Sequence, residues 1–317
     1  MLKIAVLDRC TVTNGDISFA PMEAVGKVIY YDVLPPAEIP AAIGDCDAVV
    51  VNKARITAQI MDACPNLKFI GLFATGYNNI DTVAAARRGI VVCNEPGYST
   101  QSVAQHTFAL MLHFASRVDE YAASVARGDW ANASTFSYLS FPSHELCGRT
   151  LAIYGYGNIG RKVADIGRAF GMKVIATVHS SRPAEDGVEF VDVNELFSRA
   201  DYLSLHCPLT EETRHLVNAQ TLSLMKPTAY IINTARGGVI EEGALCDALN
   251  SGRLAGAGID VLDIEPMRPG HPYLTAKNCY ITPHVAWAGL ETRQRLMQVV
   301  EANIKAFLAG SPINVVS

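Results

Sequence analysis

Three short apolar runs in the last third of the sequence each lead into a polar side chain that could take part in a reaction. Arg236 follows the run at 229–232, Glu265 follows the run at 258–261, and His284 follows the run at 279–281. We interpret these runs as buried strands because they are short and mostly apolar. Open α/β sheets bind ligands beyond the carboxyl ends of their strands, so the spacing predicts a shared site.

The chemistry of these three side chains is complementary. Arg236 is flanked by small residues, and its planar guanidinium suits bidentate capture of a carboxylate. A lone histidine is usually structural, but His284 stands at a strand end with acidic residues after the neighbouring strand, and a buried carboxylate beside an imidazole would hold the ring and stabilise its charged form. Pro266 and Pro283 restrict the backbone beside both side chains. The pattern favours general acid–base catalysis.

A glycine-rich loop indicates a second kind of site. The loop at 155–160, Gly-Tyr-Gly-Asn-Ile-Gly, follows an apolar strand pattern and leads into a helical pattern that stops at Gly171. In this context it predicts a dinucleotide site, since glycines permit a tight turn, close approach of a pyrophosphate and close packing of helix on strand. A glycine-rich turn without a ligand is the alternative. The expected cofactor contacts are Gly155, Gly157, Asn158, Ile159 and Gly160.

The residue that ends the second strand of this unit bears on the choice of cofactor. NAD sites usually place Asp or Glu there to receive the ribose 2′-OH, but this sequence has Val178. His179, Ser180 and Arg182 follow as expected cofactor contacts, and Arg182 could pair with a 2′-phosphate. We therefore expect NAD(P) as the cofactor, with use of NADP. The alternative is that Arg182 is merely solvated.

The elements that must position these residues are those of an α/β protein. Short apolar runs alternate with helical stretches from residue 3 to 93 and again from 150 to 281, which predicts parallel sheets with helices on both faces. A chain of 317 residues is expected to form two domains. Between the two series lie an apolar helix at 102–118 and an irregular aromatic segment at 128–147. Contact with a partner chain, a lid or a local hydrophobic cluster would each explain that segment.

Composition narrows the class of protein further. Half the residues are apolar, 18% are charged and the formal net charge is −5, so no basic surface for nucleic acid is expected. No apolar run approaches the roughly 18 residues of a membrane span, and the first residues lack the pattern of a signal peptide. The eight cysteines include no CxxC pair. We expect free thiols in the cytoplasm and no metal site.

Together these motifs resemble those of the D-isomer-specific 2-hydroxyacid dehydrogenase family over essentially the whole chain. The matching segments are 155–160, 233–237, Asp260 with 265–266, and 282–284. Segments 74–81 and 102–106 also match, although the family commonly has Glu at the position of Gln105. Val178 is the second departure, and it puts a preference for NAD in doubt.

The resemblance implies a role for each matching residue. Arg236 would bind the substrate carboxylate and polarise its carbonyl, His284 would exchange a proton with the oxygen at C2, and Glu265 would pair with His284. Backbone N–H groups at Thr75 and Gly76 would help hold the carboxylate. The remaining cofactor contacts would be Asp260 and the carbonyl of Thr234 or Ala235 at the nicotinamide amide, and His206, Pro208 and Thr213 on the adenosine side.

The family fold implies a Rossmann cofactor domain inserted into a flavodoxin-like substrate domain. The expected boundaries are 1–97 plus 288–317 for the discontinuous substrate domain and 98–287 for the dinucleotide-binding domain. The segment 102–147 corresponds to the dimer arm of the family, so the resemblance implies a homodimer.

Within the family, the short N-terminal pattern and segment 74–78 look most like the glycerate dehydrogenases, also called hydroxypyruvate reductases. The expected reaction is hydride transfer between a nicotinamide cofactor and a small D-2-hydroxy acid or 2-oxo acid, foremost glycerate and hydroxypyruvate, or glyoxylate. D-Lactate, a branched 2-oxo acid and 3-phosphoglycerate stay open. A dinucleotide-sensing, corepressor-like binding protein would keep the same loop, but the set of Arg236, Glu265 and His284 favours an enzyme.

Overall fold

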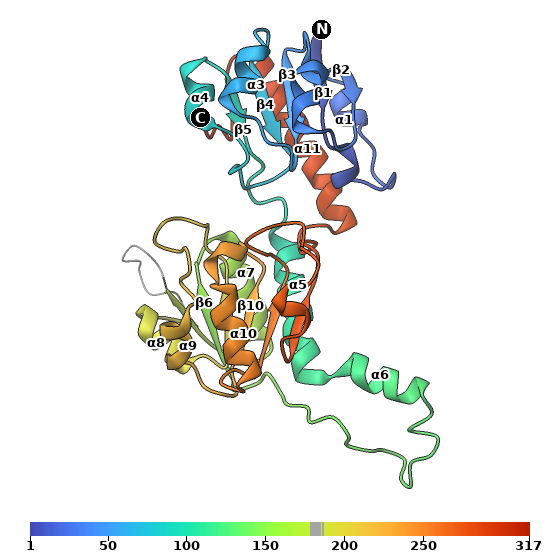
Figure 1. Ribbon diagram of the computed structural model, residues 1–317, viewed down its shortest axis with the longest axis vertical. Helices are drawn as coiled ribbons and strands as arrows, with labels where there is room; N and C mark the ends of the chain where they lie inside the picture. Colours follow the sequence, from blue (N-terminus) through green and yellow to red (C-terminus); the bar gives the residue numbers. More distant parts are fainter. Residues whose placement is uncertain (178–184, 186) are drawn as a thin grey trace. The chain divides into compact units, whose positions relative to one another are not determined.

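The computed structural model describes residues 1–177, 185 and 187–317 (Figure 1). The chain divides into two compact units, Met1–Ser99 with Trp287–Ser317, and Thr100–Ala286. Each unit is built on one sheet whose paired strands run parallel. The expected fold class, α/β with two parallel sheets, is confirmed. Among the described residues, no helix combines the length and the apolar character needed to cross a membrane.

The first unit has a five-stranded sheet in the order β2-β1-β3-β4-β5, which is the flavodoxin-like order. Its strands are β1 (Leu2–Val6), β2 (Gly26–Tyr30), β3 (Ala48–Val51), β4 (Phe69–Leu72) and β5 (Val91–Cys93). β3 and β4 are buried at every residue, because helices cover both faces of the sheet.

Alternate residues of these strands enter two separate hydrophobic clusters. The first cluster lies under α2 (Ile39–Ile43), α3 (Ala58–Ala63) and α4 (Thr82–Arg87); the second lies under α1 (Ala20–Glu23) and α11 (Leu290–Leu308). Short 3-10 turns stand at Arg9–Thr11 and Pro36–Glu38. α11 comes from the end of the chain, and its Phe307 ring lies 5.0 Å from that of Phe69. The last segment therefore completes the core of the first unit.

The second unit has a seven-stranded sheet in the order β12-β11-β10-β9-β6-β7-β8. Its strands are β6 (Thr150–Tyr154), β7 (Lys173–Thr177), β8 (Val188–Phe190), β9 (Tyr202–Leu205), β10 (Tyr230–Asn233), β11 (Gly256–Ile259) and β12 (Cys279–Ile281). The direction in which strands are added reverses between β6 and β9. Doubly wound sheets bind dinucleotides at this reversal, beyond the carboxyl ends of the strands.

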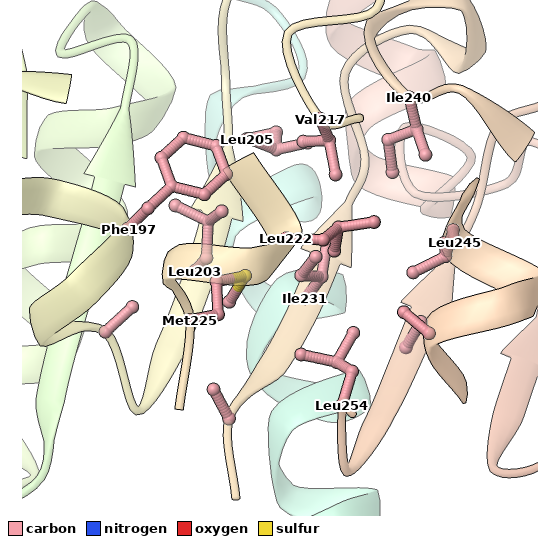
Figure 2. Packing of buried hydrophobic residues seen from close by; sticks show 14 of the residues in the cluster. Phe197, Leu203, Leu205, Val217, Leu222, Met225, Ile231, Ile240, Leu245 and Leu254 are labelled. Carbon is pink, nitrogen blue, oxygen red and sulfur yellow. The ribbon is translucent and has the colours of Figure 1, made fainter. Parts of the chain in front are cut away.

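Helices cover both faces of this sheet as well. α5 (Thr100–Ser116) and α7 (Asn158–Ala169) lie on one face. α8 (Val193–Arg199), α9 (Ala219–Leu224) and α10 (Glu242–Asn250) lie on the other, and 3-10 turns stand at Gly237–Val239 and Pro272–Leu274. Figure 2 shows the second face, where Phe197, Leu222 and Leu245 of these helices lie over the buried strand residues Leu203, Leu205 and Ile231.

α6 (Val118–Ala126) and residues 127–147 lie outside the layered body of the second unit (Figure 1). The segment has contacts of its own, since the Tyr121 hydroxyl donates to the Phe141 carbonyl and the two rings lie 5.0 Å apart. Other large apolar side chains are exposed, notably Phe136 and Leu139, each at 91%. The segment is thus held by a local cluster and also presents apolar surface.

Candidate active site

The glycine loop follows β6 at the reversal of strand order, where β9 is its neighbour. Gly155 has φ +96°, and a Cβ there would lie 2.6 Å from the carbonyl carbon of His206, which follows β9. A Cβ at Gly160 would lie 2.2 Å from the carbonyl oxygen of Gly155. Real Cβ atoms do not approach backbone so closely, so packing of β6, β9 and α7 requires glycine at both positions.

Gly157 differs from its two neighbours in the loop. It is the N-cap of α7, it makes no side-chain cap bond, and a Cβ there would meet nothing within 4 Å. By contrast, the side chains of Thr57, Asp81 and Asp192 cap α3, α4 and α8. The start of α7 thus has no side-chain cap and has open space beside Gly157, an arrangement that suits a phosphate group.

The segment after β9 forms the other side of this point. The His206 ring has Nε2 2.8 Å from the Ser204 hydroxyl, while its buried Nδ1 has no hydrogen-bond partner in the described part of the chain. Burial lowers the pKa of His206 to about 3, so the ring is neutral. The Thr213 hydroxyl donates to the Pro208 carbonyl and accepts from the N–H of Thr210. These bonds within the loop fix the expected adenosine-side residues in one turn.

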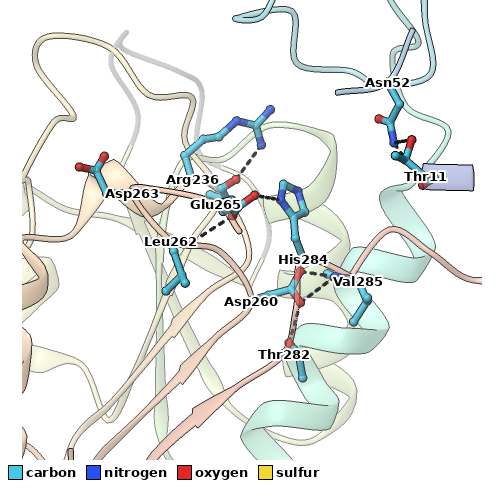
Figure 3. Close-up of polar contacts among 12 residues, drawn as sticks. Thr11, Asn52, Arg236, Asp260, Leu262, Asp263, Glu265, Thr282, His284 and Val285 are labelled. Carbon is cyan, nitrogen blue, oxygen red and sulfur yellow. Dashed lines mark hydrogen bonds and ion pairs between the residues drawn. The ribbon is translucent and has the colours of Figure 1, made fainter. Parts of the chain in front are cut away.

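Arg236 follows β10 and lies beside the segment that follows β11. The Asn233 side chain organises the turn, since its amide donates to the Arg236 carbonyl and its oxygen accepts from the Ala235 N–H. A Cβ at Gly237 would lie 1.8 Å from the carbonyl carbon of Leu262, so only glycine lets the two segments meet. The half-buried Arg236 side chain donates from Nη1 to the Ala235 carbonyl. Figure 3 shows its guanidinium above Glu265 and His284.

Glu265 and His284 form the pair that the sequence predicts. Oε2 of Glu265 lies 2.6 Å from Nδ1 of His284, and Oε1 accepts the N–H of Leu262 at 3.0 Å (Figure 3). Their side chains are about one-third and one-quarter exposed, at 33% and 26%. A carboxylate on Nδ1 fixes the ring orientation, which leaves Nε2 as the nitrogen suited to proton exchange.

The backbone of His284 is strained and is held by Asp260. His284 has φ +56°, an uncommon conformation for a residue with a side chain, and its N–H donates to the Asp260 carbonyl. The buried Asp260 carboxylate accepts from the N–H groups of Val285 and Ala286 and from the Thr282 hydroxyl. Asp260 therefore anchors residues on both sides of His284 (Figure 3). Its expected contact to the nicotinamide amide stays a prediction.

A residue of α5 extends this network. Nε2 of His106 lies 2.9 Å from the Thr282 hydroxyl oxygen, and that hydroxyl gives its only proton to Asp260. His106 must therefore donate from Nε2. Nearby, the Thr107 and Thr234 hydroxyl oxygens lie 3.2 Å apart, which ties α5 to the turn after β10. The motif at 102–106 marked this helix, but sequence reasoning gave no role to His106, Thr107 or Thr282.

Thr75 and Gly76 lie in the first unit, in the loop after β4. The Thr75 hydroxyl donates to the Glu95 carbonyl at 2.6 Å, and the Asn94 amide donates to the Thr75 carbonyl at 2.7 Å. At the same sheet edge the buried Asp8 carboxylate accepts the N–H groups of residues 52–54. Neither Asp8 nor Glu95 was singled out from the sequence. Two loops at the carboxyl edge of this sheet are thus held by the Asp8 carboxylate and by the backbone of Glu95.

The site residues expected from the sequence fall into two groups. The structure brings together Arg236, Glu265, His284 and Asp260 at the carboxyl ends of β10–β12, and the loop 155–160 with 206–213 at the reversal point. Val178, His179, Ser180 and Arg182 lie outside the described residues, so their expected part in cofactor choice is untested.

Comparison with known proteins defines the class. Residues 108–286 match the family model of the D-isomer specific 2-hydroxyacid dehydrogenase, NAD binding domain. A hydroxypyruvate reductase of Blautia hydrogenotrophica is 41% identical over 321 residues, covering all of both chains. A glycerate dehydrogenase of Methylorubrum extorquens is 38% identical, covering 90% of each chain.

Solved structures agree with this match. An NADPH-dependent glyoxylate/hydroxypyruvate reductase from Sinorhizobium meliloti, in complex with NADP and malonate, gives a TM-score of 0.85 at 29% identity, covering 100% of this chain and 97% of that one. An acyclic imino acid reductase in complex with NADPH and D-Arg gives 0.89 at 32% identity and full coverage of both chains.

The chain therefore belongs to the D-isomer-specific 2-hydroxyacid dehydrogenase family, as the motifs indicated. It is an oxidoreductase that uses a nicotinamide cofactor to interconvert 2-hydroxy and 2-oxo acids.

Proposed function

We propose that this enzyme reduces hydroxypyruvate to D-glycerate and also accepts glyoxylate. The observation that carries the proposal is the Glu265–His284 pair beside Arg236, which supplies a proton carrier and a carboxylate receptor at the ends of neighbouring strands. The names of several relatives over 90–100% of their length support this choice of substrate.

The residues divide the work of reduction. Arg236 binds the substrate carboxylate through its planar fork and polarises the C2 carbonyl. His284, held by Glu265, gives a proton to the oxygen at C2 in reduction and takes it back in oxidation. When bound, the nicotinamide supplies or accepts the hydride at C2. Asp260 keeps the strained His284 backbone in place during both directions.

The structure fits a dinucleotide at the reversal of strand order. Gly157 leaves open space in front of the uncapped start of α7, and residues 158–160 offer N–H groups to a pyrophosphate. We propose that NADPH is used at least as well as NADH, because Val178 cannot receive the ribose 2′-OH and Arg182 can pair with a 2′-phosphate. The complexes of two structural neighbours with NADP and NADPH support this proposal.

Steady-state kinetics test the proposed substrate. The enzyme is assayed with hydroxypyruvate, glyoxylate, pyruvate and 3-phosphohydroxypyruvate, each with NADPH and with NADH. We expect the highest kcat/KM with hydroxypyruvate. A higher kcat/KM with pyruvate or the phosphorylated acid would assign one of the other substrates that the sequence left open. Binding of NADPH without turnover of any 2-oxo acid would instead support the dinucleotide-sensing alternative.

We also propose a homodimer formed through α5 and the segment 117–147. Hollows on the outer side of α5 are lined by apolar residues such as Ala109 and Leu112, and Phe136 and Leu139 are exposed beyond it. Light scattering after size exclusion should give about twice the chain mass of 34.1 kDa. A cytoplasmic location stays a prediction from the sequence.

A further inference from the structure

Glu95 is a buried acid that the reaction described above does not use. It follows β5 in the first unit and its side chain is fully buried, with 0% exposure. Oε1 accepts the amide N–H of Asn303 at 2.9 Å, while the buried Oε2 has no hydrogen-bond partner within the described residues. An ionised carboxylate would keep one oxygen without a donor in an apolar interior, which is costly.

The groups that face Glu95 do not offset a negative charge. Asn303 of α11 donates one hydrogen bond and is itself held by the Asn314 side chain. On the preceding strand, burial followed by the proximity of Glu95 raises the pKa of Cys93 to about 12. Thr75 lies on the neighbouring loop and gives its hydroxyl proton to the Glu95 backbone. These partners are neutral at pH 7.

The protonation state follows from this environment. Burial raises the pKa of Glu95 to about 9, and the hydrogen bond from Asn303 lowers it only in part. The Glu95 side chain is therefore a protonated, uncharged carboxylic acid at neutral pH.

The backbone of Glu95 holds the loop that carries Thr75 and Gly76. Its N–H donates to the Ala74 carbonyl at 3.0 Å, and its carbonyl accepts the Thr75 hydroxyl at 2.6 Å. The adjacent Asn94 amide donates to the Thr75 carbonyl. Glu95 is thus joined to the loop by two hydrogen bonds, and the neighbouring Asn94 adds a third.

We propose that Glu95 is a positioning residue that works as a neutral acid, and that loss of its proton releases the loop at 74–76 and weakens substrate binding. The link to substrate rests on the proposed function and on the family resemblance, which implies that the N–H groups of Thr75 and Gly76 help hold the carboxylate. If only the protonated form binds substrate, the apparent affinity falls about tenfold per pH unit above the pKa of Glu95.

The titration of Glu95 can be separated from that of His284 by measuring the oxidation of D-glycerate. Oxidation requires the neutral His284 ring, so deprotonation of His284 at high pH does not slow it. We expect wild-type kcat/KM for D-glycerate to fall above about pH 9, with most of the change in KM. Glu95→Gln keeps the shape without a titrating proton, so its kcat/KM should stay constant from about pH 8.5 to about pH 10. The exposed Glu38→Gln is the matched control and should behave as wild type. An equal alkaline fall in Glu95→Gln and wild type would overturn the proposal.

A second measurement does not depend on catalysis or on the folding of a variant. Infrared titration of the wild-type protein should show a protonated carboxyl band at pH 7 that disappears with a midpoint near pH 9, and that is absent from Glu95→Gln. Its absence from the wild type at pH 7 would overturn the proposal. An enzyme that turns over no 2-oxo acid would overturn the proposed function and the link to substrate, while this band still decides whether Glu95 holds a proton.

Discussion

Nδ1 of His284 lies 2.6 Å from Oε2 of Glu265, although the two residues are 19 positions apart and follow different strands. The contact depends on two anchors. Glu265 is fixed through its other oxygen to the Leu262 N–H, and the His284 backbone is fixed by Asp260. The pair is thus positioned by the sheet edge before any substrate arrives.

Removal of the imidazole should abolish most catalysis without unfolding the protein. For His284→Ala we expect kcat for hydroxypyruvate to fall about 10²–10⁴-fold, since a positioned acid contributes about that much. NADPH affinity, measured by fluorescence titration, should stay near wild type. Glu265→Gln should lose less, because an amide can still contact the ring but cannot balance its charge. Near wild-type turnover by His284→Ala would show that another group carries the proton.

Substrate capture by Arg236 should depend on the shape of the side chain as well as on its charge. Arg236→Lys keeps the charge but loses the planar fork. The kcat/KM for hydroxypyruvate should therefore fall, by an amount equivalent to about 2–4 kcal/mol of weaker transition-state binding. Cofactor affinity should change little. A large rise in the Kd for NADPH, with the KM for hydroxypyruvate unchanged, would show that Arg236 binds the cofactor and not the substrate.

The glycines at 157 and 160 form a matched pair. A Cβ at Gly160 would collide with the Gly155 carbonyl at 2.2 Å, so Gly160→Ala should lower the free energy of unfolding by about 1–3 kcal/mol. A Cβ at Gly157 meets no protein atom within 4 Å, so Gly157→Ala should unfold at nearly the wild-type temperature but bind NADPH more weakly. Thermal unfolding and NADPH titration separate the two effects. Unchanged NADPH binding by Gly157→Ala would place the pyrophosphate elsewhere.

Thr282 should affect turnover through the loop that holds His284. Its hydroxyl joins His106 to Asp260, so Thr282→Val removes the acceptor of the His106 N–H and one of the hydrogen bonds to the Asp260 carboxylate, at nearly constant volume. We expect a loss of about 1–3 kcal/mol in the free energy of unfolding, together with a lower kcat. Thr275→Val, which removes an exposed hydroxyl that donates to the nearby Pro272 carbonyl, is the control. Equal stability losses in the two variants would contradict the proposed anchoring role.

Cofactor choice should respond to the end of the second strand of the cofactor unit. Val178→Asp restores an acceptor for the ribose hydroxyl and repels a 2′-phosphate, so preference should move toward NADH. Arg182→Ala should weaken NADPH and leave NADH nearly unchanged. The measurement is kcat/KM for each cofactor at saturating hydroxypyruvate. A tenfold wild-type preference for NADH, about 1.4 kcal/mol, would contradict the interpretation of Val178 and Arg182.

Continuous apolar runs predicted the interior strands well, because a strand buried on both faces has no polar alternation to obscure it. The expected strand at 229–232 differs by one residue from β10, and that at 258–261 overlaps β11. β8 was missed, since it has three residues, of which only Val188 is buried. A short edge strand carries too little apolar pattern to stand out.

Among the site residues too, contacts that follow from nearby sequence could be predicted, and contacts between distant segments could not. The pairing of Glu265 with His284 could be predicted because each follows a recognisable strand. The burial of Glu95 could not, since it depends on Asn303, 208 positions away on α11. Likewise, no sequence pattern shows that the Asp260 carboxylate accepts hydrogen bonds from the N–H groups of Val285 and Ala286.

The second unit enters and leaves the first at neighbouring points of its own structure. The Ser102 hydroxyl donates to the Ala286 carbonyl at 2.7 Å, so the two ends of Thr100–Ala286 are joined by a hydrogen bond. A domain whose two ends lie close together can be inserted into a surface loop of another protein without distorting the fold of either protein. The unit Thr100–Ala286 can therefore be exchanged between related enzymes, in evolution or by engineering, while both chain termini remain in the first unit.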